Sequence, residues 1–442
     1  MTRERLDGLY LLVLGCLVFL ALGFALENAQ PNSLADFKAL YYPARCLIEH
    51  GDPYNRNEVM RVYSAENGDG RQDTEQNRQI ATQNPYPPTA FPFTVPLALL
   101  PWGPAHFLWT AINVGSFLFA SILIWNLAEG YAPTLTGALL CFFLANSELL
   151  IVCGNVAGLV ISLCVVAVWC FFRERFVWLG IVCLAISLAI KPHDTGLVWL
   201  FFLLAGGLYR KRALQTLLVT AAVSLPALLW ISKAAPHWLE EMRFNLQAYS
   251  AHGGINDPGP ASIGGHGLDM LISLQTIFSA FWDNPRFYNL ASYLVCTPLL
   301  LIWAFITIRS RHSPKKLWLG LATIAALSML PIYHRQLDAK LLMLTVPACA
   351  MLWSEGGLTG RLALFLNGAA LVLIGDLPWA ILLVTISHLH LSGTALSRQA
   401  SIAVQVFPIP LILLGMSVFY LWVYARSCHT PDPRASGTVS AI

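Results

Sequence analysis

Charged residues are scarce in this chain of 442 residues, because Lys, Arg, Asp and Glu together make up only 12% of it. A soluble domain carries about 25% charged residues, so about half of the expected charge is missing. Hydrophobic residues reach 56% and the mean hydropathy is +0.60, which excludes a disordered chain. The composition therefore indicates an integral membrane protein.

Motifs that define several other classes of protein are also missing. The chain has no Walker loop, no GxSxG or HExxH motif, and no Asp-x-Asp pair of the kind that nucleotide-sugar transferases commonly use to bind a metal. It has no CxxC pair and no dense basic tract, so we expect no metal site, no cofactor and no nucleic-acid partner. Most of its ten cysteines lie in apolar runs, and a disulfide between Cys46 and Cys153 is one possibility that the sequence leaves open.

About twelve apolar runs are candidates for membrane-spanning helices, since a helix needs about 20 apolar residues to cross a bilayer. The predicted spans cover residues 9–26, 105–127, 133–152, 157–172, 177–190, 195–209, 213–231, 290–308, 317–332, 341–353, 362–377 and 402–425. The segment 377–391 is a candidate for a further short or re-entrant element. We therefore predict an all-α polytopic membrane protein.

The distribution of Arg and Lys among the loops predicts how these spans are oriented. Basic residues precede the first span and recur in loops on the same predicted side, at Arg3, Arg5, Arg173, Arg175, Arg210, Lys211, Arg212, Arg309, Arg311, Lys315, Lys316, Arg361 and Arg426. Because loops rich in Arg and Lys stay in the cytoplasm, we predict cytoplasmic N and C termini in a bacterial inner membrane. Residues 1–426 would form one membrane-embedded domain with outer loops at 27–89 and 232–286, and 427–442 a disordered cytoplasmic tail.

The two outer loops differ in composition. In the first, residues 34–49 have the apolar spacing of a helix, which we predict to lie along the membrane surface. Residues 55–83 are polar and interrupted by glycine, which is typical of a mobile segment. The second loop is rich in Gly, His and Asn around 252–254 and 264–267.

Polar residues gather at the predicted outer ends of the spans, and charge at membrane depth is a mark of function. Asp36 has two interpretations, as a cap of the predicted surface helix or as a general base for an incoming hydroxyl. Lys191, His334 and Arg335 are either interfacial anchors or donors to the phosphate of a lipid-linked donor. Weaker candidates for binding substrate are Tyr42, Arg45, Asn155 and His193, although His193 could pair with Asp194 and Tyr42 could be an interfacial aromatic.

An ordered set of short motifs resembles a known family. The set comprises Asp36-Phe37, Tyr41-Tyr42, Ala44-Arg45, Gly51-Asp52-Pro53-Tyr54, Tyr86-Pro87-Pro88, Pro96-Leu97, Leu100-Pro101, Gly154-Asn155, Lys191-Pro192, and Tyr333-His334-Arg335 with Asp338. In this order, over roughly residues 8–425, the sequence resembles glycosyltransferase family 87. The resemblance implies a GT-C fold, a polytopic helical bundle with its active site on the outer face of the membrane.

The resemblance also implies a reaction and roles for some residues. Characterised members of the family are similar to mannosyltransferases that take mannose from a polyprenyl phosphate with inversion. The resemblance gives the role of base to Asp36, matches His334 to a histidine near the end of a late helix, and matches Lys191 to a frequent Lys-Pro pair. The chain departs from the family pattern in the polar segment 55–83 and at Gln336-Leu337, which stands before Asp338.

We therefore expect transfer of a sugar, most simply mannose, from a polyprenyl-phosphate donor in the membrane lipid to a glycolipid or glycan acceptor at a periplasmic site. Three alternatives stay open: a transporter or flippase for a lipid-linked sugar, an enzyme of the O-antigen ligase or polymerase type with a lipid-diphosphate donor, and a structural scaffold. The long outer loops and the polar residues on one side argue against a transporter, which binds its cargo near the bilayer midplane.

Overall fold

The computed structural model of the chain describes residues 2–30, 33–67, 75–259, 271–310, 313–388 and 407–429. Within these residues the regular structure is helical, and an isolated β-bridge joins Leu271 to Arg335. The predicted all-α fold is therefore confirmed for the described part of the chain. The last helix extends to His429, past the predicted start of the tail, whereas 264–267 and 430–442 lie outside the described residues.

The helices differ widely in length. In chain order they are α1 (Arg3–Ala29), α2 (Ala35–Ile48), α3 (Arg56–Asn67), α4 (Glu75–Thr82), η1 (Pro88–Ala90), α5 (Phe91–Ala98), α6 (Trp102–Ala128), α7 (Pro133–Leu144), α8 (Leu149–Cys153), α9 (Ala157–Arg173), α10 (Val177–Ile190), α11 (Pro192–Ala205), α12 (Gly207–Ala234), α13 (Trp238–Ser250), α14 (Leu274–Phe281), α15 (Pro285–Arg309), α16 (Pro314–Leu327), η2 (Asp338–Thr345), α17 (Val346–Glu355), α18 (Gly357–Ile374), α19 (Asp376–His388) and α21 (Pro408–His429). Here η denotes a 3₁₀ helix.

Six helices of the described chain are long and apolar enough to cross a membrane, namely α1, α6, α12, α15, α18 and α21. Shorter apolar helices, α7, α9 and α10, accompany them. The predicted count of about twelve spans is therefore not confirmed. One reason is that the predicted span 133–152 breaks into α7 and α8, because Asn146, Ser147 and Glu148 place three polar side chains between them. Another is that the predicted span 341–353 begins as the 3₁₀ helix η2.

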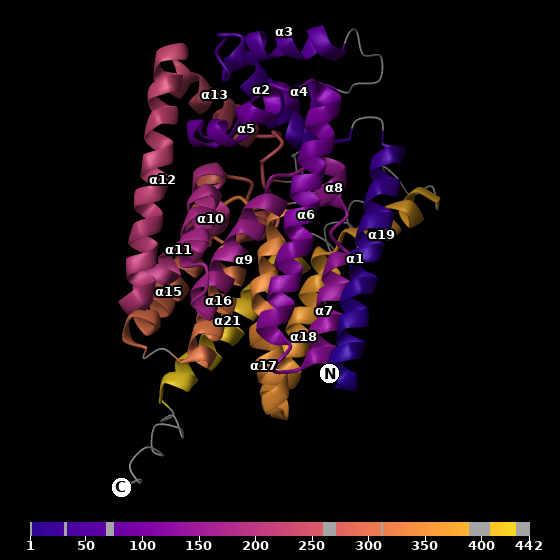
Figure 1. Cartoon of the computed structure of the whole chain (residues 1–442), viewed down its shortest axis with the longest axis vertical. Coiled ribbons are helices and arrows are strands. Elements are labelled where there is room, and N and C mark those ends of the chain that lie inside the picture. The colour runs from indigo at the N-terminus through magenta and orange to yellow at the C-terminus, as the bar shows by residue number, and fades with distance from the viewer. Residues whose placement is uncertain are drawn as a thin grey trace.

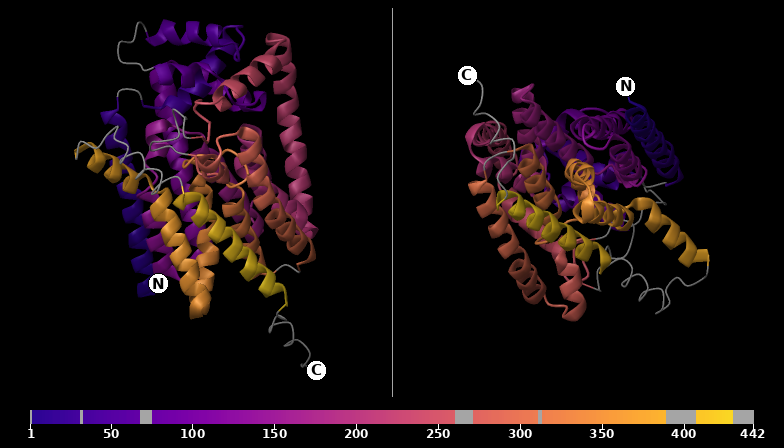
Figure 2. Two further views of the ribbon diagram at one scale, coloured as in Figure 1. Left: turned by 180° about the vertical axis from the view of Figure 1, so that it is seen from behind. Right: turned by 90° about the horizontal axis from the view of Figure 1, so that it is seen from below.

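The molecule has two parts, a bundle of long helices and a cap at one end of it (Figure 1). Helices α2, α3, α4, α5 and α13 form the cap, and α1, α6 and α12 reach up to it from the opposite end. The left view of Figure 2 also places the start of α1 and the end of α21 away from the cap. The cap thus combines segments from both predicted outer loops, although about 140 residues separate those loops along the chain.

Basic loops meet at the end of the bundle where α1 begins. Arg5 makes two hydrogen bonds to the carboxylate of Glu129 after α6, at 2.8 and 2.7 Å. Arg173 at the end of α9 donates to the carbonyl of Asn126 near the end of α6, at 2.5 Å. Arg212 in α12 donates to the carbonyl of Phe171 in α9, at 2.8 Å. These contacts gather the basic residues of three loops at the end opposite the cap.

The predicted surface helix 34–49 forms as α2, but it lies inside the cap and not on a surface. Most of its side chains are buried beneath α3, α4 and α5, because apolar and aromatic residues occupy all of its sides. Phe37 stacks on Trp109 with ring centroids 4.8 Å apart, and Trp102 covers the next part of the helix. The core of the cap is therefore aromatic, and α2 is held rigidly within it.

The polar segment 55–83, predicted to be mobile, forms two helices, α3 and α4. Val59, Val62 and Tyr63 on α3 are buried against α2, which shows that a few apolar positions are enough to dock an otherwise polar helix. Residues 68–74 between the two helices lie outside the described residues.

Candidate active site

A cavity of about 850 Å³ lies between the cap and the bundle. Its walls come from α2, α4 and α13 of the cap and from the breaks between α8 and α9, between α10 and α11, and before η2. The polar side chains that line it include Asp36, Tyr86, Asn155, Lys191, His193, Tyr249, Asn256, Tyr333, Arg335 and Asp338. Segments far apart in the sequence therefore deliver most of the predicted site residues to one place.

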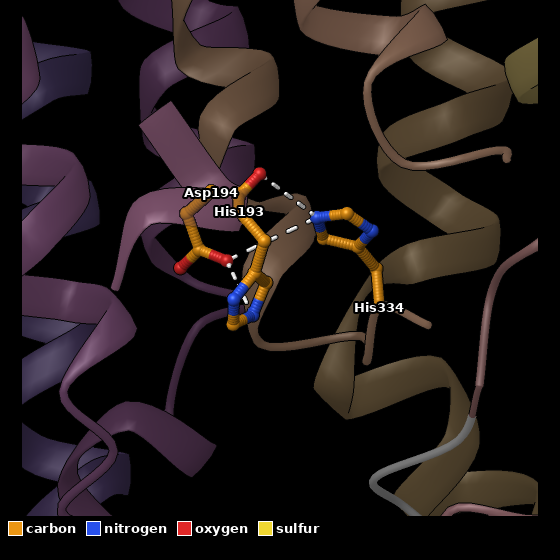
Figure 3. A group of neighbouring side chains, drawn as sticks. All are labelled: His193, Asp194 and His334. Atoms are coloured by element: carbon orange, nitrogen blue, oxygen red, sulfur yellow. Dashed lines mark hydrogen bonds and ion pairs between the residues drawn. The ribbon is translucent and has the colours of Figure 1, made fainter. Parts of the chain in front are cut away.

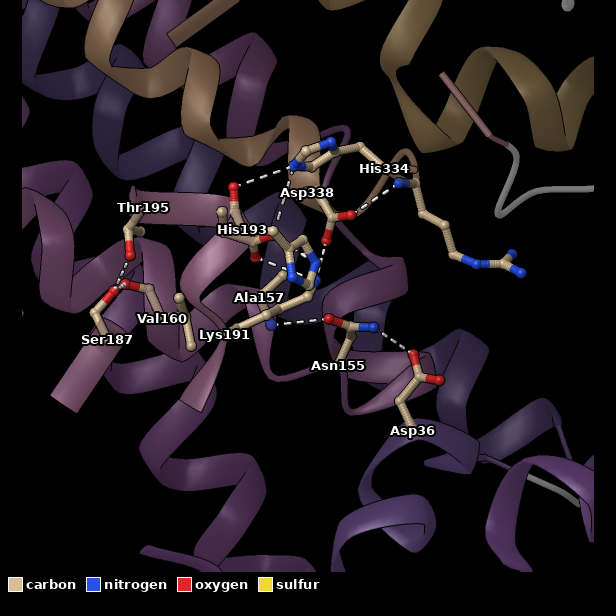
Figure 4. A network of polar contacts seen from close by, with 12 residues as sticks. Asp36, Asn155, Ala157, Val160, Ser187, Lys191, His193, Thr195, His334 and Asp338 are labelled. Atoms are coloured by element: carbon tan, nitrogen blue, oxygen red, sulfur yellow. Dashed lines mark hydrogen bonds and ion pairs between the residues drawn. The ribbon is translucent and has the colours of Figure 1, made fainter. Parts of the chain in front are cut away.

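Asp36 lies in the first turn of α2 and lines the cavity. Leu34 is the N-cap residue of α2 and makes no side-chain cap, and Asp36 lies in the first turn, where a carboxylate favours the helix dipole. The side-chain amide of Asn155 donates to Asp36 Oδ2 at 2.6 Å. The N–H of Ala157 donates to Asn155 Oδ1 at 2.8 Å, which fixes the amide with its NH₂ group toward Asp36 (Figure 4).

Gly154 allows α2 to approach Asn155 this closely. It adopts a left-handed conformation with φ +61° after α8, and a Cβ there would lie 2.4 Å from the side chain of Leu34. Trp109 donates to the carbonyl of Gly154 at 2.9 Å, which holds the turn. A residue with a side chain would be strained in this conformation and would push α2 away. The Gly154-Asn155 pair is thus one positioning unit for Asp36.

Lys191 lies between α10 and α11, where it forms a buried cluster with two carboxylates. Its Nζ contacts Oδ1 of Asp338 and lies 3.1 Å from Oδ2 of Asp194. Asp338 Oδ2 also accepts the backbone N–H of Arg335 at 2.8 Å. Figure 4 shows Asn155 between this cluster and Asp36.

The residues of this cluster lie outside the six candidate spans. Burial lowers the pKa of Lys191, but the carboxylates of Asp194 and Asp338 outweigh burial and hold this pKa well above its usual value. Burial raises the pKa of Asp338, but Lys191 and the nearby histidines bring it down to about 2. Burial and the neighbouring Asp338 raise the pKa of Asp194 to about 8. Lys191 is therefore a permanent cation beside the cavity.

Arg335 connects the bundle to the cap across the cavity. Its Nη2 donates to the carbonyl of Ile255 at 2.8 Å and to Asn256 Oδ1 at 3.0 Å, both in the segment after α13. Its Nε donates to the hydroxyl of Tyr333 at 2.9 Å. The guanidinium thus brings a second positive charge to the cavity wall and holds the neighbouring chain in place.

His334 was expected to face the substrate phosphate, but the structure buries it behind the wall. Its side chain is 1% exposed, its Nδ1 lies 3.2 Å from the carbonyl of Ile332, and its Nε2 lies 3.4 Å from the carbonyl of His193. Burial lowers the pKa of His334 from its usual value, so the ring is neutral at pH 7. His193 does line the cavity, with a third of its side chain exposed.

Tyr42 and Arg45 are not brought to the cavity. The ring of Tyr42 is fully buried in the aromatic core of the cap, stacked on Trp102. Arg45 donates to the carbonyl of Ala98 at 3.0 Å and pairs with Glu49. Both residues therefore stabilise the cap. Cys46 and Cys153 are free thiols in the structure.

Several lining residues were missed by sequence reasoning. Tyr249 of α13 lines the cavity, and its hydroxyl donates to the carbonyl of Gln83 at 3.0 Å. Asn245, one turn earlier, does not line the cavity but supports α13, since its amide donates to the carbonyl of Tyr54 at 2.9 Å. Nothing in the composition of the second loop distinguishes these residues, because their partners are backbone carbonyls of another segment. Tyr86 lay within a motif of the family resemblance, which was the one available signal.

A deep cavity lined by one carboxylate on the cap side and cations on the bundle side suits group transfer within a membrane. A comparison with known protein families identifies the class of transferase. The model of glycosyltransferase family 87 matches residues 84–332, more than half of the chain. The chain belongs to glycosyltransferase family 87 and is a membrane-embedded glycosyltransferase. The matched residues include Asn155 and Lys191, whereas Asp36 and Arg335 lie outside them. No curated protein and no solved structure matches the chain.

Proposed function

We propose that this glycosyltransferase inverts the configuration of a sugar, mannose, as it moves it from a polyprenyl-phosphate donor to a lipid or glycan acceptor. The observation that carries this proposal is the arrangement of charge in the cavity. One carboxylate, Asp36, lines the side formed by α2. Two cations, Lys191 and Arg335, line the bundle side together with the carboxylate of Asp338. An inverting transfer needs one base for the acceptor and positive charge for the leaving group.

Asp36 is the general base of this proposal. Its carboxylate accepts the proton of the acceptor hydroxyl while that oxygen forms a bond to C1 of the sugar. The bond between C1 and the phosphate oxygen breaks on the opposite face, and both of its electrons leave with the polyprenyl phosphate. The hydrogen bond from Asn155 holds the carboxylate in place for this attack.

Lys191 and Arg335 stabilise the charge that grows on the phosphate. Both lie on the cavity wall. Lys191 is paired with Asp338 and Asp194, and Arg335 donates to the carbonyl of Ile255, to Asn256 and to the hydroxyl of Tyr333. His334 takes no direct part, since it lies behind the wall. His193 is the histidine that borders the cavity.

The proposed site faces the periplasm of a bacterial inner membrane. The cavity lies at the cap end of a GT-C-type bundle, and the basic loops lie at the other end. Since basic loops remain in the cytoplasm, the cap lies outside, where lipid-linked sugars are available and nucleotide sugars are not.

Sugar transfer by the purified protein in lipid tests this proposal. The protein receives radiolabelled polyprenyl-phosphate mannose and a panel of glycolipid acceptors. We expect transfer by the wild type and a rate about 10²- to 10⁴-fold lower for Asp36→Asn, since the amide cannot accept the proton. A matched control is Glu49→Gln, which removes a carboxylate elsewhere on the cap and should leave the rate unchanged.

The possible outcomes separate the alternatives. Activity that survives in Asp36→Asn would remove Asp36 from the mechanism and leave the class intact. Transfer from a lipid-diphosphate donor, with none from the monophosphate, would favour an enzyme of the O-antigen ligase type. Movement of the lipid-linked sugar across vesicle membranes without transfer would favour a flippase.

A further inference from the structure

Three side chains at the cavity wall, of which His193 lines the cavity, form a cluster with the composition of a metal site. The atoms are His193 Nε2 and Asp194 Oδ1 from the start of α11, and His334 Nε2 from the segment before η2 (Figure 3). Asp194 Oδ1 lies 3.3 Å from His193 Nε2 and 4.0 Å from His334 Nε2, and the three atoms lie within 4.8 Å of one another. Two imidazoles and one carboxylate are ligands that zinc and similar divalent ions accept.

Both nitrogens of the His334 ring lie near a backbone carbonyl, so a neutral ring can donate to only one of them and keeps a lone pair on the other. His334 Nδ1 lies 3.2 Å from the carbonyl of Ile332, which favours a hydrogen on Nδ1 and a lone pair on Nε2. That Nε2 then faces another acceptor, the carbonyl of His193, at 3.4 Å. A histidine that donates one ring N–H to a backbone carbonyl and presents the other nitrogen is the usual arrangement of a metal ligand.

The other two atoms also lack partners that the fold would normally provide. His193 Nε2 and Asp194 Oδ1 are buried atoms that make no hydrogen bond in the structure, and the side chain of Asp194 is fully buried. A buried carboxylate oxygen without a hydrogen bond is costly, because it has lost its water, and the ammonium of Lys191 lies at the other oxygen of Asp194, Oδ2, at 3.1 Å. A single proton could serve one pair of these atoms, whereas a metal ion would serve all three.

The charge of the site leads to the same conclusion. The side chains that line the cavity include two carboxylates, Asp36 and Asp338, and two cations, Lys191 and Arg335. Their charges cancel, so they give an anionic phosphate no net attraction. A divalent ion bound to the carboxylate of Asp194 would make the balance +1.

We propose that His193, Asp194 and His334 bind a divalent metal ion of the zinc class at the edge of the cavity. Metal–ligand bonds of about 2.0–2.2 Å place ligand atoms about 3.3–3.5 Å apart in a tetrahedral site, so shifts below about 1 Å would close this one. Three protein ligands leave a fourth position. His193 is the member of the three that lines the cavity, so the cluster adjoins the cavity wall.

This inference deepens the proposed function and rests on it for the role of the ion, which would bind an oxygen of the donor phosphate together with Lys191. It departs from the expectation, drawn from the sequence, that the site needs no metal. Binding of the ion itself depends only on the three ligands and can be measured without any donor.

Cobalt binding to the whole protein in detergent tests the proposal. The protein is stripped with EDTA and titrated with Co²⁺, whose visible absorption reports nitrogen and oxygen ligation, and bound Zn²⁺ is counted by mass spectrometry. We expect one ion per chain in the wild type. We expect affinity to fall by at least 10- to 100-fold in His193→Ala and in Asp194→Asn, since even the loss of outer-shell partners has effects of that size.

A second cluster provides the matched control. His252 lies 3.5 Å from Asp257 and 3.7 Å from Asp283, but its side chain is 66% exposed, and His252→Ala should leave binding unchanged. His193→Ala truncates a side chain that borders open space, so this variant can fold even if Asp194→Asn does not. The thermal midpoint of each variant establishes folding.

The proposal fails if the wild type binds no stoichiometric ion, or if folded His193→Ala binds as tightly as the wild type. It also fails if His252→Ala abolishes binding. None of these outcomes bears on sugar transfer by Asp36, which the donor assay measures separately.

Discussion

Two lysine–carboxylate clusters are buried in the part of the chain that the structure describes, and the short helix η2 contributes to both. Asp338 at its start pairs with Lys191 beside the cavity. Lys340, two residues later, lies 3.4 Å from Asp376 and donates to the carbonyl of Asn146 at 2.8 Å. Glu148 completes the second cluster, where it is 1% exposed and its carboxylate oxygens make no hydrogen bond.

The two clusters differ in their access to space. The first borders a cavity of about 850 Å³, whereas Lys340 and Asn146 border a void of about 10 Å³, which is room for about one water molecule. The second cluster instead ties backbone together, since Asp376 also accepts the N–H of Leu149 at 2.8 Å. Buried charge in a membrane protein therefore does not by itself mark a functional site. Access to a cavity decides which cluster can meet a substrate.

Lys340→Met should disrupt the second cluster, which is sealed off from the cavity and is called the sealed cluster below. We expect this variant to have the largest effect on stability. Removing one partner of a buried pair leaves an uncompensated charge, here on Asp376, which costs about 3–5 kcal/mol. We expect a lower thermal midpoint in detergent and loss of folded protein during purification. The double variant Lys340→Met/Asp376→Asn should recover part of that stability. No recovery would mean that the pair does not act as a unit.

Lys191→Met should affect the rate of sugar transfer more than the stability of the protein. Water from the cavity can hydrate Asp338, which lines it, so the loss of stability should be smaller, about 1–3 kcal/mol. The rate of sugar transfer should fall by about 10²- to 10³-fold, because a cation on the leaving phosphate is lost. The thermal midpoint and the transfer rate of the two lysine variants, measured side by side, check this. If Lys191→Met lost as much stability as Lys340→Met and still transferred sugar at the wild-type rate, the two clusters would not differ in function.

Two buried side-chain amides, one near each cluster, extend the comparison of the clusters to smaller expected effects. Asn155→Ala removes the 2.6 Å hydrogen bond to Asp36, and we expect a transfer rate roughly 10- to 100-fold lower with little loss of stability. Gln336→Ala removes the 2.7 Å hydrogen bond to the carbonyl of Ile374, near the sealed cluster. It should cost about 1 kcal/mol of stability and leave the rate of the folded enzyme unchanged. A loss of rate in Gln336→Ala would show that the sealed region influences the cavity.

Much of the helical content could be predicted from the sequence. The predicted span 177–190 has the bounds of α10, and 157–172 differs from α9 by one residue. Asp36, Asn155, Lys191 and Arg335 were chosen because polar groups at apolar span ends are costly, and the fold brings all four to one cavity. Local sequence was sufficient in these cases because burial in lipid imposes a strong pattern.

The remaining features depend on contacts between distant segments. The burial of His334 follows from its packing against α11, whose start lies about 140 residues earlier in the chain. The helices α3 and α4 form because α2 provides a surface for their few apolar residues, a surface invisible in the polar sequence itself. The break between α7 and α8 could have been predicted, since Asn146, Ser147 and Glu148 stand in the middle of an apolar run.

The hydrogen bonds within the cap, and those between the cap and the bundle, affect which positions can vary among related enzymes. Asn245, Tyr249 and Arg335 all donate to backbone carbonyls, those of Tyr54, Gln83 and Ile255. A carbonyl is the same in every amino acid, so the accepting positions Gln83 and Ile255 can drift without loss of the bond. The donating positions cannot. Substitution libraries should therefore tolerate change at the accepting position of each contact but not at the donating position. Homologous enzymes can then vary the outer loops to suit new acceptors while the cap stays in place over the cavity.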